Sequence, residues 1–288
     1  MSTKYRDIYY RVDQGLRLYA RDYPGAASPT VLLCLHGLSR NSADFEPLCE
    51  FLSGRYRIIS VDQRGRGLSQ WDAEPSRYQL PNYVEDMWAL LDQQGIDRVV
   101  VVGTSMGGLM GMLMAAQRPE RIQGLVINDV GPEVDPKGLA RIMGYVGKAV
   151  QVETWDDAVA QTKAINQVCF PNFTSEQWWA MARRTYREND QGVPIPNYDP
   201  QISTPIHDED SAAVPTDLWP IFESISVPLL ALRGGLSDLM SADCLQTMAT
   251  LQPHMQWVEI DGVGHAPVLD EPQAVAAIEN FISQFADE

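Results

Sequence analysis

The sequence predicts an α/β fold in which a mainly parallel sheet is covered by helices on both faces. Short apolar, β-branched runs alternate along the chain with longer helical patterns, as they do in such folds. Several of these runs are apolar at every position, which is typical of strands buried on both faces. A block of about 85 residues with helical patterns and no strand then interrupts the alternation, which resumes after it.

Eight strands are expected in all. The first two, 5–12 and 16–22, are expected to pair antiparallel around a turn at Gln14-Gly15. The other six predicted strands are 30–35, 57–61, 98–102, 124–128, 227–232 and 256–260. The predicted core helices are 44–53, 81–94, 105–117, 242–251 and 272–285. Pro81 suits a first helical turn and Gly95 suits a C-terminal stop, so the second of these helices has clear ends.

Residues 131–216 interrupt the alternation after the sixth strand. Three helical patterns follow one another here without a strand between them: 136–150, 154–165 and 175–187. Residues 192–205 are rich in Pro and polar side chains, as in an irregular loop. Open α/β sheets bind ligands at the carboxyl ends of their strands, and an insertion at this point covers that edge. We therefore expect a core of residues 1–130 and 217–288 and a helical cap, or lid, at 131–216.

Charge and composition exclude several classes of function. The chain has 288 residues, with 22 Lys and Arg against 38 Asp and Glu, and its net charge is −16. No basic surplus exists to bind nucleic acid or an anionic membrane surface. The four cysteines show no CxxC or Cys/His ligand spacing, so we expect neither a metal site nor a redox site, and reduced thiols in a cytoplasmic protein. A secretory signal is not expected, because no apolar run follows the start of the sequence.

One uncharged segment, 99–116, is 18 residues long and so reaches the length of a membrane span. Its glycines favour a buried strand, a tight turn and a close-packed helix instead. The turn reads Gly103-Thr104-Ser105-Met106-Gly107, which is a G-x-S-x-G pattern between a predicted strand and a predicted helix. Such a turn presents the serine hydroxyl at the edge of the sheet, so Ser105 is the predicted nucleophile.

A nucleophilic serine needs a base, and His265 suits this role among four histidines. It follows Gly262 and Gly264 in a loop after the last predicted strand, and can reach the edge that presents Ser105. His36 follows a buried strand and precedes Gly37, so we expect it to shape that turn. His207 lies in the irregular part of the insertion, and His254 at a helix end.

The third member must be a carboxylate that orients the imidazole. Asp238 and Asp129 both follow predicted strands, so both can reach the same edge of the sheet. Asp238 has the chain order Ser, Asp, His of this arrangement and lies in a glycine-containing turn, so it is the favoured acid. Asp129 is then a supporting or hinge residue.

Two backbone N–H groups are needed to stabilise the oxyanion. One is expected from Met106, which follows the nucleophile. The other is expected from Leu38, because Gly37 lets the loop after the strand 30–35 curl inward.

These motifs together resemble the α/β-hydrolase fold superfamily over nearly the whole chain. They are His36-Gly37, the run 62–69 (DQRGRGLS), the turn 103–107, Gly235 with Asp238, and Gly264-His265. The similarity is closest to the capped esterase, lactonase and carbon–carbon bond hydrolase branch. It implies a triad of Ser105, Asp238 and His265, with Leu38 and Met106 at the oxyanion hole. For the run 62–69 it implies a structural role.

The predicted reaction is hydrolysis of a carboxylic ester or lactone of a small to medium apolar substrate through an acyl-enzyme on Ser105. A serine here disfavours the aspartate-nucleophile chemistry of haloalkane dehalogenases and epoxide hydrolases, and no nucleotide-binding glycine pattern implies a cofactor. Two alternatives stay open: a carbon–carbon bond hydrolase of a ring-cleavage diketone, and a non-catalytic receptor for a small ligand. Arginines that could bind a substrate carboxylate are Arg40, Arg141, Arg183 and Arg184. A homo-oligomer is compatible with the sequence.

Overall fold

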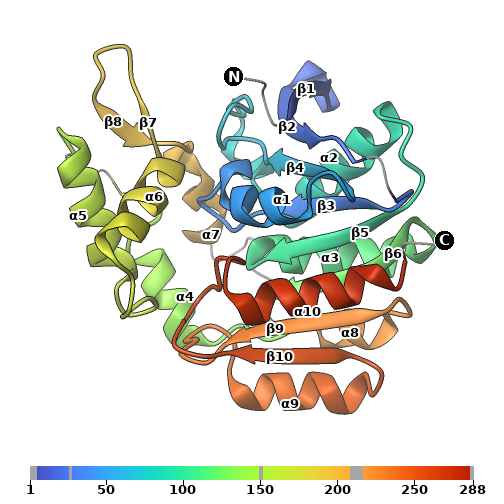
Figure 1. Cartoon of the computed structure of the whole chain (residues 1–288). Helices are drawn as coiled ribbons and strands as arrows, with labels where there is room; N and C mark the ends of the chain where they lie inside the picture. The colour runs from blue at the N-terminus through green and yellow to red at the C-terminus, as the bar shows by residue number, and fades with distance from the viewer. Residues whose placement is uncertain (1–4, 26–27, 149–151, 208–216, 286–288) are drawn as a thin grey trace.

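The computed structural model describes residues 5–25, 28–148, 152–207 and 217–285. Eight strands form one sheet in the order β1-β2-β4-β3-β5-β6-β9-β10 (Figure 1). They are β1 (Arg6–Arg11), β2 (Arg17–Tyr23), β3 (Val31–Leu35), β4 (Arg57–Asp62), β5 (Val99–Thr104), β6 (Ile122–Asn128), β9 (Leu229–Gly234) and β10 (Gln256–Ile260). Strand β2 is antiparallel to β1 and to β4, and all the other pairs are parallel. The predicted mostly parallel sheet is therefore confirmed.

Helices cover both faces of this sheet. They are α1 (Glu46–Leu52), α2 (Leu80–Gln93), α3 (Met106–Gln117), α8 (Trp219–Ser224), α9 (Ala242–Leu251) and α10 (Pro272–Ser283). Alternate side chains of β5 enter different cores: Val99 and Val101 pack in the cluster with α2, α3, α8 and α9, whereas Val100 and Val102 pack in the cluster with α1 and α10. This two-sided burial explains why the strand is apolar at every position.

The uncharged segment 99–116 divides as its glycines predict. It forms β5 and then α3, which meet at a tight turn. Among the residues that the structure describes, no helix combines the length and the apolar character that crossing a membrane requires.

The segment expected as the cap carries helices and one short hairpin beside the carboxyl ends of the parallel strands (Figure 1). Its elements are α4 (Pro136–Met143), α5 (Trp155–Asn166), α6 (Ser175–Thr185), β7 (Tyr186–Glu188), β8 (Pro194–Pro196) and α7 (Thr204–His207). Thr154 and Thr174 begin α5 and α6 with capping boxes. Residues 149–151 and 208–216 of the expected cap lie outside the described part of the chain.

Two expectations for this segment are wrong in detail. The first helix ends at Met143 rather than near residue 150, because the chain cannot continue as a helix through Gly147, whose φ is +75°. A Cβ at Gly147 would lie 2.1 Å from the Ser203 hydroxyl, so a glycine is required there. The Pro-rich stretch is also not wholly irregular, since β8 pairs antiparallel with β7.

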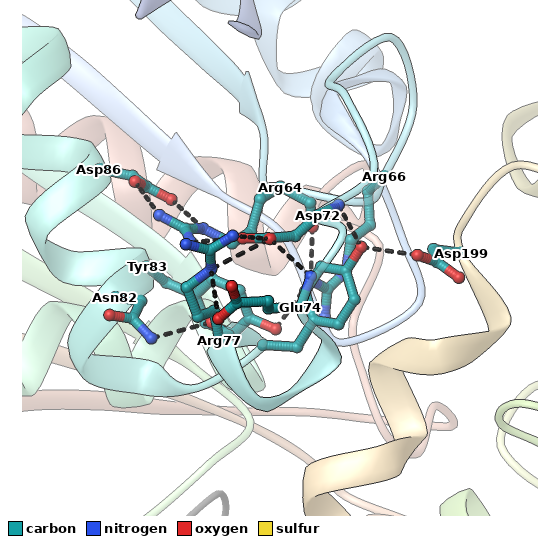
Figure 2. Close-up of polar contacts among 10 residues, drawn as sticks. Arg64, Arg66, Asp72, Glu74, Arg77, Asn82, Tyr83, Asp86 and Asp199 are labelled. Carbon is teal, nitrogen blue, oxygen red and sulfur yellow. Dashed lines mark hydrogen bonds and ion pairs between the residues drawn. The ribbon is translucent and has the colours of Figure 1, made fainter. Parts of the chain in front are cut away.

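A buried ionic network joins the core to this segment (Figure 2). Arg64 donates to both oxygens of Asp86, at 2.7 and 2.5 Å, and to Asp72 at 2.9 Å. The Tyr78 hydroxyl accepts from the Asp72 backbone N–H and donates to Asp199, at 2.6 Å, on the far side of the network. Buried charges are stabilised when all their hydrogen bonds are made, and these contacts attach the loop after β4 to α2 and to the segment that contains Asp199.

Candidate active site

Ser105 lies at the turn between β5 and α3 in a strained backbone conformation. Its φ is 53° and its ψ is −119°, which L-residues rarely adopt. The neighbouring positions have no room for a side chain. A Cβ at Gly103 would lie 2.2 Å from the Gly107 carbonyl oxygen, and a Cβ at Gly107 would lie 2.0 Å from that of Leu35. The glycines of the G-x-S-x-G pattern therefore let β5 and α3 approach closely enough to present the serine.

His265 connects Ser105 to a carboxylate. Its Nε2 lies 2.9 Å from the Ser105 Oγ, and its Nδ1 lies 2.8 Å from the Oδ2 of Asp129. The tautomer that satisfies both contacts has the proton on Nδ1, so the imidazole donates to the carboxylate and accepts from the hydroxyl. The structure thus brings together the predicted nucleophile and the predicted base.

The Asp129 side chain is fully buried, and each of its oxygens has hydrogen-bond donors. Its Oδ1 accepts from the Gly234 backbone N–H at 2.7 Å. Its Oδ2 accepts from the Ser237 hydroxyl at 2.7 Å as well as from His265. Such donors complete the hydrogen bonding of the buried carboxylate and fix its orientation toward the imidazole.

Asp238, the favoured acid in the sequence, is not the hydrogen-bond partner of His265. Its carboxylate forms a two-point ion pair with Arg141 of α4, at 2.6 and 2.8 Å. That hydrogen bonding holds the pKa of Asp238 below its usual value. Gly138 of the same helix packs against the Asp238 carbonyl, where a Cβ would lie 2.4 Å away. The side chain is therefore used to attach α4 to the core.

The expectation for Asp238 is corrected by the geometry of the sheet. Asp129 directly follows β6, which pairs with the strand that leads to Ser105. Asp238 lies four residues beyond Gly234, the last residue of β9, and its carboxylate is engaged by Arg141 instead of the imidazole. The place of Asp129 one residue after a buried strand is the signal that could have favoured it, but the chain order of the motif favoured Asp238.

Arg66 hydrogen-bonds the loop that carries the predicted oxyanion donor Leu38. The Arg66 Nε donates to the Leu38 carbonyl at 2.8 Å, and its Nη1 donates to the Tyr83 hydroxyl at 2.8 Å. The other predicted donor, Met106, is the first residue of α3, so its N–H has no partner within the helix. The run 62–69 thus supports the loop beside Ser105, in agreement with the structural role that the resemblance implies.

His36 shapes the same loop rather than taking part in proton transfer. Its Nδ1 lies 2.7 Å from the Gly37 carbonyl oxygen, and its Nε2 accepts from the Gln63 backbone N–H at 3.0 Å. The ring is fully buried and held in the neutral form, because burial lowers its pKa to about 3.

His36 is therefore expected to make the protein less stable in mild acid. The unfolded chain takes up a proton near pH 6.5 and the folded chain only near pH 3, so stability falls as the pH drops below about 6.5. Between pH 7.5 and 5 this loss amounts to about 2 kcal/mol. Urea unfolding of the wild type and of His36→Asn at both pH values isolates the contribution of His36 to the free energy of unfolding. Other titrating groups, such as Asp86 with its pKa raised by burial to about 6, contribute equally to both proteins and cancel in the comparison. An imidazole signal of His36 that titrates near pH 6.5 by NMR in the folded protein would contradict this expectation.

Two cavities meet at Ser105. The first, here called the polar cavity, is lined by groups that include Arg40, Asp44, Arg184 and His265. The second, here called the apolar cavity, is lined by groups that include Met106, Leu109, Leu139 and Leu239. Ser105, Leu38 and Ile142 line both cavities.

A family model described as the alpha/beta hydrolase fold matches residues 30–272. The chain belongs to the α/β-hydrolase family. A solved structure of an alpha/beta hydrolase from Novosphingobium aromaticivorans superposes on this hydrolase with a TM-score of 0.93 and 41% identity, over 99% of this chain and 100% of that one.

Two curated relatives match the hydrolase over most of its length. One, from Cupriavidus necator, is named 3-hydroxybutyrate-oligomer hydrolase and is 34% identical, over 93% of each chain. The other, from Mesorhizobium japonicum, is named 2-(acetamidomethylene)succinate hydrolase and is 30% identical, over 96% of this chain and 95% of the relative. The relatives are hydrolases with different substrates, so they support an enzyme of this class and leave the bond that it cleaves open.

Proposed function

We propose that this hydrolase cleaves carboxylic esters through an acyl-enzyme on Ser105. The observation that carries the proposal is the continuous hydrogen-bonded chain from the Ser105 hydroxyl through His265 to Asp129. In this arrangement the imidazole can take the serine proton, and the buried carboxylate stabilises the imidazolium that forms. Asp129 replaces Asp238 as the proposed acid.

The proposed reaction has two steps. In the first, the Ser105 Oγ bonds to the ester carbonyl carbon while its proton moves to the His265 Nε2. The N–H groups of Leu38 and Met106 stabilise the oxyanion, and the alcohol leaves with the proton from His265. In the second, His265 takes a proton from water, the hydroxide attacks the acyl carbon, and the acid leaves as the Ser105 hydroxyl is restored.

Ester cleavage is favoured over the alternatives by one relative. The name of the Cupriavidus necator protein, 3-hydroxybutyrate-oligomer hydrolase, specifies a substrate whose units are hydroxy acids joined by ester bonds. A small-molecule ester is accordingly the proposed partner, and the four free, buried cysteines favour a cytoplasmic location. Carbon–carbon cleavage of a ring-cleavage diketone requires the same serine and histidine, so an experiment must separate the two.

Rapid mixing with p-nitrophenyl butanoate is expected to give a burst of p-nitrophenol followed by slower turnover, because the acyl-enzyme accumulates. Mass spectrometry of the quenched protein should find the butanoyl mass on the peptide that contains Ser105. A ring-cleavage diketone, tested in parallel, should turn over at least ~100-fold more slowly in kcat/KM. Efficient cleavage of the diketone with no acylation by the ester would favour the carbon–carbon hydrolase, and binding without any turnover would favour a receptor.

A further inference from the structure

The polar cavity carries an unbalanced positive charge, although the chain as a whole has a net charge of −16. Among the described residues that line it, the permanently charged groups are Arg40, Asp44 and Arg184, so two cations face one anion. His36 is neutral, since burial lowers its pKa to about 3. A net positive cavity in so acidic a protein attracts anions selectively.

Asp44 is already paired with Arg40. The guanidinium of Arg40 contacts both oxygens of Asp44, at 2.7 and 2.6 Å, and also contacts the Thr185 hydroxyl. In this two-point geometry both oxygens of the Asp44 carboxylate accept hydrogen bonds from Arg40. The charge of Arg40 is therefore compensated within the protein.

Arg184 is the cation that makes no ion pair among the described residues, although its charge acts on Asp44 at longer range. Its guanidinium has no carboxylate within 4.0 Å and no hydrogen-bond acceptor among the described residues, and its Nε is buried. Its backbone is nevertheless fixed, because the Asn41 side chain donates to the Arg184 carbonyl at 2.7 Å. A guanidinium that lines a cavity and makes no ion pair offers its N–H groups to the oxygen of an anionic ligand.

The position of His265 decides which part of an ester would reach this site. His265 lines the polar cavity, and Met106 lines the apolar one. The leaving oxygen must lie next to the imidazole that protonates it, so the alcohol part of the ester belongs in the polar cavity. The acyl part then lies on the other side of Ser105, among apolar side chains such as Leu109.

We infer that Arg184 binds a carboxylate on the alcohol part of the substrate, so that the hydrolase selects apolar acyl esters of hydroxycarboxylic acids. The inference rests on the proposed ester hydrolysis and adds the substrate class to it. It also modifies the expectation of a small to medium apolar substrate, because only the acyl side of Ser105 is lined mainly by apolar side chains.

Three small esters test the inference. The first is 3-(butanoyloxy)butanoate, whose carboxylate is on the alcohol part. The second is its uncharged amide, 3-(butanoyloxy)butanamide, and the third is monobutyl succinate, whose carboxylate is on the acyl part. The wild type should prefer the first over both others by ~10-fold or more in kcat/KM, as for a charged group that finds its partner. Raised salt should narrow this preference only slightly, since the site is partly buried.

Arg184→Gln should remove the preference and leave hydrolysis of the amide within about twofold of wild type. Arg184→Lys should restore part of it, because a point charge replaces a two-point donor. The matched control is Arg183→Gln. Arg183 is the neighbouring arginine, but it is exposed and lines neither cavity. Its Cζ lies 3.7 Å from the centroid of the Trp155 ring. This control should keep the wild-type preference.

The outcomes separate the inference from the proposed function. Equal wild-type rates on the acid and the amide would overturn the carboxylate site while leaving ester hydrolysis intact. A wild type that prefers monobutyl succinate would overturn the assignment of the two cavities. Equal losses on all three esters in Arg184→Gln would show that Arg184 acts only by supporting the fold around Asp44. Failure of the wild type to cleave any ester would overturn the proposed function itself.

Discussion

Ser105→Ala is expected to lower kcat for ester hydrolysis by ~10⁶-fold, to the level that binding and the oxyanion donors alone provide. The reason is that no other described nucleophile lies within hydrogen-bond distance of the His265 Nε2. Steady-state rates with a purified, active-site-titrated protein measure the effect. Loss of less than tenfold would mean that the ester is cleaved without an acyl-enzyme on this residue.

The same position should show a trade-off between activity and stability. The Ser105 backbone lies at φ 53°, where a side chain costs ~1–3 kcal/mol and glycine costs little. Ser105→Gly should therefore be as inactive as Ser105→Ala but more stable, by about 1 kcal/mol in the free energy of unfolding. Urea denaturation of the two variants provides the comparison. If Ser105→Gly is the less stable variant, the turn does not store strain at this residue.

Much of the core was predictable because its physical requirements are local. A strand such as β5 is buried on both faces, so each of its positions must be apolar and the sequence shows it directly. The turn at Ser105 was equally predictable from the sequence. Gly103 and Gly107 must be glycines because a Cβ at either position would clash, at Gly103 with the backbone of Gly107 and at Gly107 with the neighbouring strand β3. Ser105 and His265 could be chosen because each follows a strand at the same edge of one sheet.

Features that depend on contacts between distant segments were not predictable. The end of α4 depends on Gly147, which packs against Ser203 more than fifty residues later. Arg184 makes no ion pair because Asp44, which lines the same cavity, binds Arg40 through both of its oxygens. Which of the two arginines Asp44 binds depends on the positions of distant segments. The choice between Asp129 and Asp238 depends likewise on the path of one loop after β9.

Asp129→Asn is expected to lower kcat by ~10⁴-fold, whereas Asp238→Asn should cost less than about tenfold. The Asp129 carboxylate accepts from Gly234, Ser237 and His265, and an amide has only one oxygen for these donors. If the oxygen stays on the Gly234 N–H, the amide NH₂ donates to the His265 Nδ1. The proton then resides on Nε2, which can no longer accept the serine proton.

Asp238→Asn removes a charge from the Arg141 pair and weakens the attachment of α4, so its effect should fall on KM and thermal stability more than on kcat. Measuring kcat, KM and the melting temperature for both variants separates the two roles, and Ser237→Ala, which removes one donor from Asp129, should lie between them. An inactive Asp238→Asn beside an active Asp129→Asn would require Asp238 to leave Arg141 and turn to His265. That movement would break the two-point ion pair and leave the Arg141 guanidinium without a carboxylate partner, so the structure favours Asp129.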